Sequence, residues 1–401
     1  MDKHIIVHAD QRRYESSIKY IENSDLSDVN KKLLLSFKDC LRRDGIGFKR
    51  IAKYLYHFGL IAKWIDKDLD KITKDDINRV IDHIDGNGYT YNTQYDFKVC
   101  LKKFYKWLYK VDKDPFSIKT PSKKKRTKLP TTDELFTLEE IKRMTETAGS
   151  IRNSAMVITL YESGSRASEF LTLQIKDLEF DEFGAKVRLV GKTGERFVRL
   201  VMAVPYLLNW ISNHPTKHDK NSWLWVNENR GFMNRNFDKP IGYTPLREII
   251  RNILQKTGVS RRGNLHSFRK SRACYMANFL TESQLCNFFG WSIGSEEVAT
   301  YVKSSMRQTE EAVLKMHGLH NANRDQHDRI LQPIKCDICM YFNDSKGKFC
   351  GRCGKPLGIA IAIEAEQRKK DAEGVLDWMA KEPEFQEVVE RLMKKHNAIN
   401  I

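Results

Sequence analysis

The 401-residue chain has no apolar run that approaches the roughly 18 residues of a membrane-spanning helix. Its first residues, MDKHIIVHADQRR, also lack the long apolar segment of a signal peptide. No amphipathic segment stands out as a lipid anchor. We therefore expect an intracellular, soluble protein of the cytoplasm that has no membrane partner.

The sequence also lacks the cysteine pattern of a secreted disulfide scaffold. Four of its eight cysteines are scattered among apolar neighbours, where we expect buried free thiols. These four are Cys40, Cys100, Cys274 and Cys286. The other four lie close together near the end of the chain, which is not the arrangement of cysteines in a secreted disulfide scaffold.

Positive charge is abundant, with 69 Lys and Arg against 52 Asp and Glu and a formal net charge of +17. An excess of this size favours a polyanionic partner, most often nucleic acid. Hydrophobic residues make up 41% of the chain, which is enough to build cores, so a disordered protein is excluded. The length predicts two or more domains.

The first hundred or so residues have helical periodicity. One apolar stripe recurs at spacings of four and three, through Ile51, Leu55, Phe58, Ala62 and Ile65. Thr73 and Asp76 resemble a capping box before INRVIDHI. A second stripe comprises Phe97, Leu101, Phe104 and Leu108. Lysines lie between its members, and for any single one we expect an ordinary solvated position: Lys98, Lys102, Lys103 and Lys106.

A proline-containing stretch without apolar periodicity follows, and we assign residues 119–134 to a linker. It carries a Lys/Arg cluster from Lys123 to Lys128. Two interpretations stay open. The basic linker tracks phosphates along a duplex, or it is a plain solubilising connector.

A second domain begins at Thr137, which forms another capping-box pattern with Glu140. Helical periodicity continues through SAMVITLYESGSRASEFLTL. The short β-branched segments AKVRLV and RFVRLV then flank GKTGE, which predicts a β-hairpin with Lys192 at its turn. We expect helices to resume at about Pro245 and to continue past Tyr301.

The clustered cysteines have the spacing of a metal site: Cys336, Cys339, Cys350 and Cys353. Each CxxC aims two thiolates at one point, and two such knuckles supply the tetrahedral sulfur shell of structural Zn²⁺. No coordination position stays open, so we expect a structural zinc ribbon that needs its metal to fold. An iron–sulfur cluster is the alternative. DNA and a partner subunit are both open as its binding partner.

Four scattered stretches share one further pattern: SGSRASEFLTL, GKTGERFVRL, LHSFRK and FFGWSIGSEEVATY. They contain Arg166, Lys192, His266 with Arg269, and Trp291 with Tyr301. In this order they resemble the boxes TGxRxSELxxL, GKGxKER, HxLRH and LGH…Y of the tyrosine recombinase (phage integrase) family. The resemblance extends from the helical N-terminal domain to Tyr301.

The resemblance implies that Tyr301 attacks a DNA phosphate and forms a 3′-phosphotyrosyl intermediate. A tyrosine with an ordinary pKa near 10 needs help at neutral pH. The implied roles are a general base or proton shuttle for His266 and a general acid for Lys192.

In the same resemblance, Arg166 and Arg269 stabilise the charge of the transition state, because a planar guanidinium pairs with two oxygens at once. Trp291 positions the phosphate or packs the Tyr301 segment. No metal, nucleotide or small-molecule substrate is needed. The expected partners are double-stranded DNA and further copies of the chain, as a tetramer in the synapse, which implies a nucleoid-associated protein.

The expected fold is mainly α and multidomain. The resemblance implies a helical, SAM-like core-binding domain over residues 10–118 and an α-rich catalytic domain with a small antiparallel sheet over residues 135–322. The zinc ribbon over 333–358 and a helical tail over 359–401 lie outside the common family core. Similar ribbons occur in some archaeal-type members.

Three positions differ from the usual family pattern. Trp291 stands where His is commoner, and Lys270 stands where many members have a second His. The interval from Trp291 to Tyr301 is one residue longer than usual. Two alternative functions are a type IB topoisomerase, which uses the same chemistry on one duplex, and a non-catalytic DNA-binding regulator.

Overall fold

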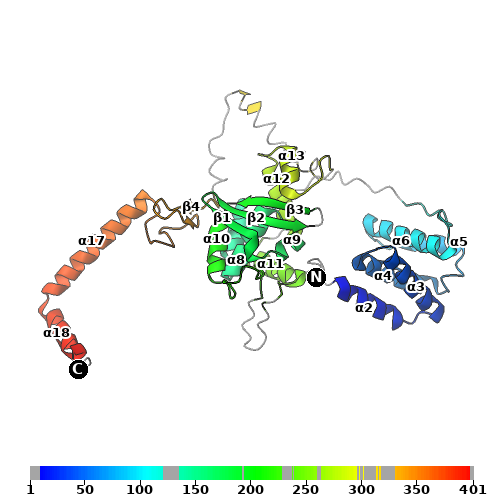
Figure 1. The fold of residues 1–401 in the computed structure, drawn as a ribbon, viewed down its shortest axis with the longest axis horizontal. Helices are drawn as coiled ribbons and strands as arrows, with labels where there is room; N and C mark the ends of the chain where they lie inside the picture. Colours follow the sequence, from blue (N-terminus) through cyan, green and yellow to red (C-terminus); the bar gives the residue numbers. More distant parts are fainter. Residues whose placement is uncertain are drawn as a thin grey trace. The chain divides into compact units, whose positions relative to one another are not determined.

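The computed structural model describes residues 10–120, 135–191, 194–227, 237, 239–259, 263–295, 298, 301, 313–314, 316–317 and 330–397. The chain divides into two compact units, Met1–Leu129 with Lys239–Tyr243, and Pro130–Asp238 with Thr244–Ile401. Helices dominate both units and the sheets are small and antiparallel (Figure 1), so the predicted mainly α class is confirmed. The predicted domain limits stay predictions.

The first unit is helical throughout its described elements. They are α2 (Asp10–Glu22), α3 (Asp28–Arg43), α4 (Phe48–Ile65), α5 (Lys74–Gly86) and α6 (Tyr91–Tyr109). The capping box at the start of α5 is confirmed, because the Thr73 side chain accepts from the Asp76 N–H while Asp76 accepts from the Thr73 N–H. Both predicted apolar stripes face the core: Ile51, Leu55, Phe58, Ala62, Phe97, Leu101 and Phe104 are buried.

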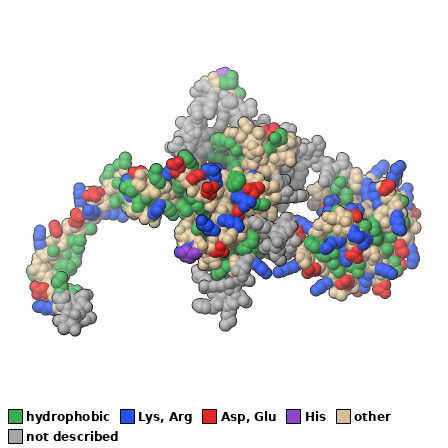
Figure 2. All heavy atoms as spheres, in the orientation of Figure 1, with side chains coloured by type: hydrophobic (Ala, Val, Ile, Leu, Met, Phe, Trp, Pro, Cys, Tyr) green, Lys and Arg blue, Asp and Glu red, His purple; other side chains and the backbone are tan. Residues whose placement is uncertain are grey.

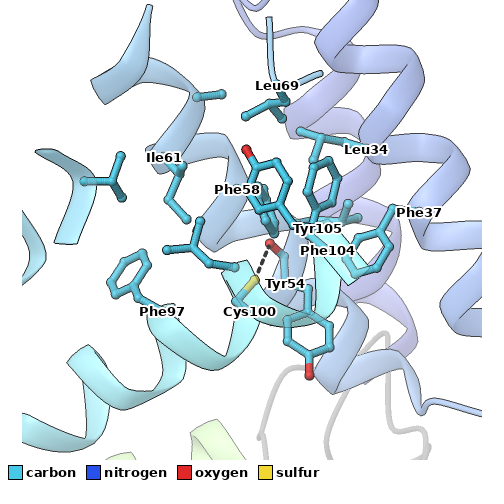
Figure 3. Close-up of a cluster of buried hydrophobic side chains, with 14 of the residues drawn as sticks. Leu34, Phe37, Tyr54, Phe58, Ile61, Leu69, Phe97, Cys100, Phe104 and Tyr105 are labelled. Carbon is cyan, nitrogen blue, oxygen red and sulfur yellow. Dashed lines mark hydrogen bonds between the residues drawn. The ribbon is translucent and has the colours of Figure 1, made fainter. Parts of the chain in front are cut away.

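An aromatic cluster forms the centre of this core (Figure 3). The rings of Phe58 and Phe104 lie 4.2 Å apart, and Phe37 meets Phe104 edge-on at 5.2 Å. Burying a side chain of this size contributes about 1.5–3 kcal/mol. Cys100 is buried among them, and its Sγ lies 3.9 Å from the Tyr54 carbonyl, as predicted for a structural thiol.

One of the lysines on α6 is not solvated, which corrects the expectation for Lys98. Its side chain is only 7% exposed, and its Nζ donates to Asp85 at 2.7 Å. Burial of a charged group is tolerated here because the partner carboxylate compensates for the lost water. Lys102 and Lys103 lie nearer the surface and face Asp114 and Asp44.

The second unit contains a three-stranded antiparallel sheet in the order β1 (Leu178–Asp181), β2 (Gly184–Gly191), β3 (Gly194–Leu200). The predicted hairpin is confirmed, with Gly191 opposite Gly194 and Ala185 opposite Leu200. Val187 and Leu189 alternate inward as a half-buried strand requires. The sequence interpretation did not include β1. The predicted turn residue Lys192 lies outside the described residues.

Helices surround this sheet. They are α7 (Leu138–Glu146), α8 (Ile151–Ser163), α9 (Ala167–Leu171), α10 (Val204–Ser212), α11 (Tyr243–Thr257), α12 (Leu265–Met276) and α13 (Glu282–Phe289), with a short 3₁₀ turn at Ile175–Asp177. The predicted capping box of Thr137 and Glu140 begins α7. Helix α10 was missed, because we expected helices to resume only near Pro245. It begins at Val204 with Pro205 in its first turn, a position that proline favours.

Helix α8 is the central element of this unit. Residues 155–163 are all buried, and α7, α10, α12 and β3 pack against α8. Its buried Glu162 accepts hydrogen bonds from the N–H groups of Val201, Met202 and Ala203 at 2.7–3.0 Å. Burial raises the pKa of this carboxyl group. Glu162 thereby fixes the end of β3 to the central helix.

The last part of the chain contains a small ribbon and a helical tail. Strands β4 (Ile334–Lys335) and β5 (Phe342–Asn343) pair antiparallel, and α17 (Ile359–Lys381) and α18 (Pro383–Asn397) follow. No side chain of α17 is buried. Among the helices that the structure describes, none combines the length and the apolar character needed to cross a membrane.

Candidate active site and metal centre

Arg166 lies at the junction of α8 and α9. Helix α8 ends at Gly164 in the left-handed conformation (φ 53°), and Arg166 is the N-cap residue of α9. A Cβ atom at position 164 would also collide with the ring of Phe289, so glycine is required there. The Arg166 backbone N–H and Nη1 donate to the two oxygens of Glu169, each at 2.8 Å.

Arg269 is buried on α12, with 3% of its surface exposed. Its Nη1 donates to the Gly164 carbonyl at 2.8 Å and its Nη2 to the Phe289 carbonyl at 2.6 Å. The guanidinium also lies 5.2 Å from the ring centre of Trp291. Burial, reinforced by the charge of Arg166, lowers the pKa of Arg269 to about 9, so the group stays cationic at neutral pH.

Trp291 and Tyr301 stack face to face. Their ring centres are 5.4 Å apart and the planes differ by 8°. Tyr301 is 4% exposed and belongs to an apolar cluster with Phe289 and Val298. Trp291 therefore packs against the Tyr301 side chain, which was one of the two roles expected for it.

Three arginines converge on the C-terminal end of α13. The successive carbonyl groups of Phe288, Phe289 and Gly290 accept hydrogen bonds from Arg196 at 2.8 Å, Arg269 at 2.6 Å and Arg166 at 3.3 Å, respectively. The last carbonyls of a helix have no partner within the helix and form the negative end of its dipole. This end therefore gathers the guanidinium groups immediately before Trp291.

Glu169 joins two of these arginines. Its carboxylate accepts two hydrogen bonds from Arg166 and two from Arg196, at 2.8–3.0 Å. Burial opposes ionisation of Glu169, but the hydrogen bonds and charge of Arg196, followed by those of Arg166, prevail and lower its pKa to about 2. Glu169 is therefore an anion that orients both guanidinium groups.

Sequence reasoning missed Glu169 and Arg196. Glu169 follows Arg166 by three residues, and a glutamate at that spacing is the capping-box signal that located α7, so a signal was present. Arg196 has no such local signal, because its partner Glu169 lies 27 residues earlier in the sequence.

The structure gives less information about the other two predicted catalytic residues, His266 and Lys192. His266 is exposed in the first turn of α12, three residues before Arg269, and its backbone N–H donates to Asn264 Oδ1 at 2.8 Å. Lys192 lies outside the described residues. Its neighbour Gly191 packs so closely on the Glu169 carboxylate that a Cβ atom at position 191 would collide with it. The hairpin end that precedes Lys192 thus abuts the arginine cluster.

An open cleft of about 390 Å³ adjoins this cluster. Arg196 and Phe197 of β3 line one side, and Asn287, Gly290 and Trp291 line the other. A larger open cleft of about 740 Å³ lies in the first unit and is lined in part by Lys98, Lys102 and Lys119. We take the smaller cleft as the candidate site because Trp291 and one member of the arginine cluster, Arg196, line it.

The four predicted metal ligands lie together at the ribbon. Sγ atoms of Cys336 and Cys353 are 3.6 Å apart, those of Cys339 and Cys350 are 3.5 Å apart, and all four lie within 4.8 Å of one another. Zn–S bonds of about 2.3 Å in a tetrahedron require sulfur separations near 3.8 Å. The four residues can hold a metal.

The ribbon is seated on other elements of the second unit. The Tyr206 hydroxyl of α10 donates to Asp344, and Lys346 pairs with Glu146 of α7. Lys335 Nζ donates to the carbonyl of Glu182, in the turn between β1 and β2, at 2.8 Å. These contacts tie the two-stranded ribbon to helices and to a turn that also frame the sheet.

Known proteins resemble this chain in sequence. Residues 134–308 match the model of the phage integrase family. Tyrosine recombinase XerA of Pyrococcus horikoshii is 22% identical over 72% of this chain and 94% of its own length. Tyrosine recombinase XerC of Pediococcus pentosaceus is 27% identical over 57% and 79%, respectively.

Solved structures share the fold. XerH site-specific recombinase, in a post-cleavage complex with a palindromic difH substrate, has a TM-score of 0.53 and 18% identity over 78% of this chain and 96% of that one. A lambda integrase dimer bound to a COC′ core site has a TM-score of 0.52 and 13% identity over 67% and 76%.

Fold and site together define the second unit as a phage-integrase-type catalytic domain. The sheet with its hairpin, the arginine pair and the tyrosine that follows α13 all occur in the order expected from the sequence. Residues 134–308 belong to the phage integrase family, and the relatives that align with more than half of this chain are tyrosine recombinases.

Proposed function

We propose that Tyr301 is the nucleophile with which this tyrosine recombinase cleaves and rejoins DNA in site-specific recombination. One observation carries the proposal: Arg166 and Arg269, from two distant segments, converge on the end of α13, where Trp291 stacks on Tyr301. Arg269 lies close enough to Arg166, Glu169, Arg196 and Tyr301 for all four to affect its pKa.

In the proposed reaction, the Tyr301 Oη attacks the scissile phosphorus and the bond from phosphorus to the 5′-oxygen breaks. The Tyr301 proton passes to His266, and Lys192 gives a proton to the departing 5′-oxygen. Arg166 and Arg269 donate to the non-bridging oxygens, where negative charge grows. Attack by a 5′-hydroxyl on the phosphotyrosine reverses these steps and joins the strands.

Tyr301 and Arg269 both pack against Trp291 of the same chain, which favours attack within the same protomer. A mixture of Tyr301→Phe and Arg269→Ala proteins tests this assignment. Each variant lacks one half of the site, so attack within a protomer leaves the mixture inactive. Recovery of covalent adduct in the mixture would instead assign the tyrosine to a neighbouring protomer.

We further propose that the metal of the cysteine cluster is Zn²⁺ in a structural role. Four cysteines fill a tetrahedral shell, so no position is left for substrate. A ribbon with two strands of two residues has little core of its own, and bound zinc would supply the folding free energy. No step of the strand transfer is assigned to the metal.

Double-stranded DNA and further copies of the chain are the proposed partners. XerH and lambda integrase were each solved on DNA, lambda integrase also as a tetramer on a Holliday junction. The tail helices offer a surface for assembly, since Leu376, Trp378 and Leu392 are 61%, 63% and 59% exposed. Hydrophobic side chains lie at the surface of the tail helices among charged ones (Figure 2). Deleting residues 358–401 should weaken assembly on DNA without preventing cleavage.

A cytoplasmic, nucleoid-associated location stays a prediction.

A nicked duplex that carries the attachment site tests the central proposal. Cleavage near the nick releases a short fragment, so the covalent protein–DNA adduct accumulates. Wild-type protein should form the adduct and Tyr301→Phe should not, while Tyr275→Phe, in the neighbouring helix α12, serves as the matched control. An adduct with Tyr301→Phe would refute the assignment. No adduct with wild-type protein on a genuine site would favour the DNA-binding regulator.

A further inference from the structure

Arg196 occupies a position where its strand would ordinarily place an apolar side chain. It pairs with Leu189 across the hairpin, and Leu189, Val198 and Leu200 at the inward positions are all buried. The Arg196 side chain is accordingly only 9% exposed. A cation in such a place needs strong compensation, because burial removes it from water.

The compensation comes from two elements outside the hairpin. Nη1 and Nη2 pair with both oxygens of Glu169 on α9 at 3.0 and 2.8 Å. Nε donates to the carbonyl of Phe288, in the last turn of α13, at 2.8 Å. One planar guanidinium thus fixes β3 to the elements that hold Arg166 and Trp291, which a lysine with its single nitrogen cannot reproduce.

The same carboxylate also contacts the other strand of the hairpin. Gly191, the last residue of β2, packs against Glu169 with no room for a Cβ atom. Gly191 directly precedes Lys192 in the sequence. Glu169 and Arg196 therefore determine where the end of β2 lies relative to the phosphate-binding arginines.

We propose that Arg196 is a positioning residue that aligns the β2–β3 hairpin to the Arg166–Arg269 pair. The described end of β2, Gly191, directly precedes the proposed proton donor Lys192 in the sequence. Arg196 itself touches neither the phosphate nor the leaving group in this account. The inference depends on the proposed role of Lys192 as the general acid. It assigns Arg196 to leaving-group protonation rather than to attack by Tyr301.

A change of the leaving group allows its protonation to be tested separately from attack by Tyr301. A duplex with sulfur in place of the 5′-bridging oxygen releases a thiolate, which needs no proton because thiols are far stronger acids than alcohols. A variant that only misplaces the acid should cleave the sulfur duplex normally. A variant that damages phosphate binding or the fold should cleave both duplexes slowly.

The experiment measures single-turnover adduct formation on oxygen and sulfur duplexes by the full-length protein. Arg196→Gln should slow cleavage of the oxygen duplex by about 100-fold, the effect typical of small misplacements in an active site. Arg196→Lys retains the charge and should be slow to a similar degree. Both should cleave the sulfur duplex at nearly the wild-type rate.

Three reference variants complete the comparison. Lys192→Ala should show the same selective rescue by sulfur, and Arg269→Ala should stay slow on both duplexes. Arg199→Gln, on the same strand but paired with Asp181 at the surface, should resemble wild type on both.

Equal loss on both duplexes, or no loss on either, in the Arg196 variants would overturn the inference. Absence of sulfur rescue in Lys192→Ala would overturn it as well, since Arg196 would have no acid to align. That last result would refute the proposed acid while leaving Tyr301 as the nucleophile. The two failures are therefore distinguishable.

Discussion

The arginine cluster and the cysteine cluster are both compact groups of ionisable side chains, yet the chain builds them in opposite ways. Four cysteines within residues 336–353 meet through two local turns, whose knuckle hydrogen bonds run from Met340 N–H to Cys336 O and from Gly354 N–H to Cys350 O. Arg166, Arg196 and Arg269 meet only because α8, β3, α12 and α13 pack around one helix end. The first cluster forms through local turns and can hold a metal, and the second depends on the packing of the whole domain.

The largest effect should come from breaking the metal shell. Cys350→Ser removes a buried ligand, and a structural zinc site contributes about 10–16 kcal/mol to the folding of a small domain. We expect loss of bound zinc by elemental analysis and rapid hydrogen exchange over residues 330–357. Cys40→Ser, outside the cluster, should retain the metal. Full zinc content in Cys350→Ser would contradict the assigned ligand set.

The second largest effect should come from a substitution in the arginine cluster, which should slow adduct formation without changing the metal content. Arg269→Ala removes two hydrogen bonds that hold the site together. In the proposed reaction it also removes a donor to the phosphate. Loss of one such donor typically costs about 2.7–4 kcal/mol, so adduct formation should slow by about 10²–10³-fold. Arg199→Ala provides the matched surface arginine. An unchanged rate in Arg269→Ala would remove this residue from the active site.

Acid should weaken the arginine cluster through Glu169. Its pKa is lowered from 4.5 to about 2 in the folded chain, so its stabilising contribution is complete above pH 4.5 and is lost as the pH falls towards 2. The difference corresponds to at most about 3 kcal/mol. Glu169→Gln should therefore lower the free energy of unfolding at neutral pH and flatten its decline in acid, measured by denaturant titration. An unchanged acid profile would contradict this.

The smallest effect on stability should come from removing a hydrogen bond that attaches the ribbon to α10. Tyr206→Phe removes the hydroxyl that donates to Asp344, a loss of about 1 kcal/mol. A double-mutant cycle with Asp344→Asn, read by hydrogen exchange in the ribbon, isolates this pair. Tyr56→Phe, an exposed tyrosine of the first unit, is the control. Additive effects in the cycle would show that the two residues do not interact.

The contrast between the cysteine cluster and the arginine cluster also explains which features could be predicted from the sequence. Local signals located the capping boxes at Thr73 and Thr137, the hairpin and the cysteine cluster, because each depends on residues a few positions apart. The resemblance to a family supplied the catalytic residues, whose roles remain proposals.

The partners that compensate for a buried charge could not be predicted from the sequence when they lie on another element. Lys98 looked like a surface lysine and is buried against Asp85, thirteen positions earlier. Arg196 received no prediction and fills an inward position, where Glu169 and Phe288 compensate for its burial. In both cases the deciding partner belongs to another element, so no local spacing could reveal it.

The most direct test of the central claim is to identify the residue that carries DNA in the trapped adduct. Nuclease and protease digestion of the wild-type adduct leaves a nucleotide on one peptide, which mass spectrometry can sequence. We predict a phosphotyrosyl bond at Tyr301, on a peptide that also contains Val298. A nucleotide on Tyr275 or on any other residue would contradict the account.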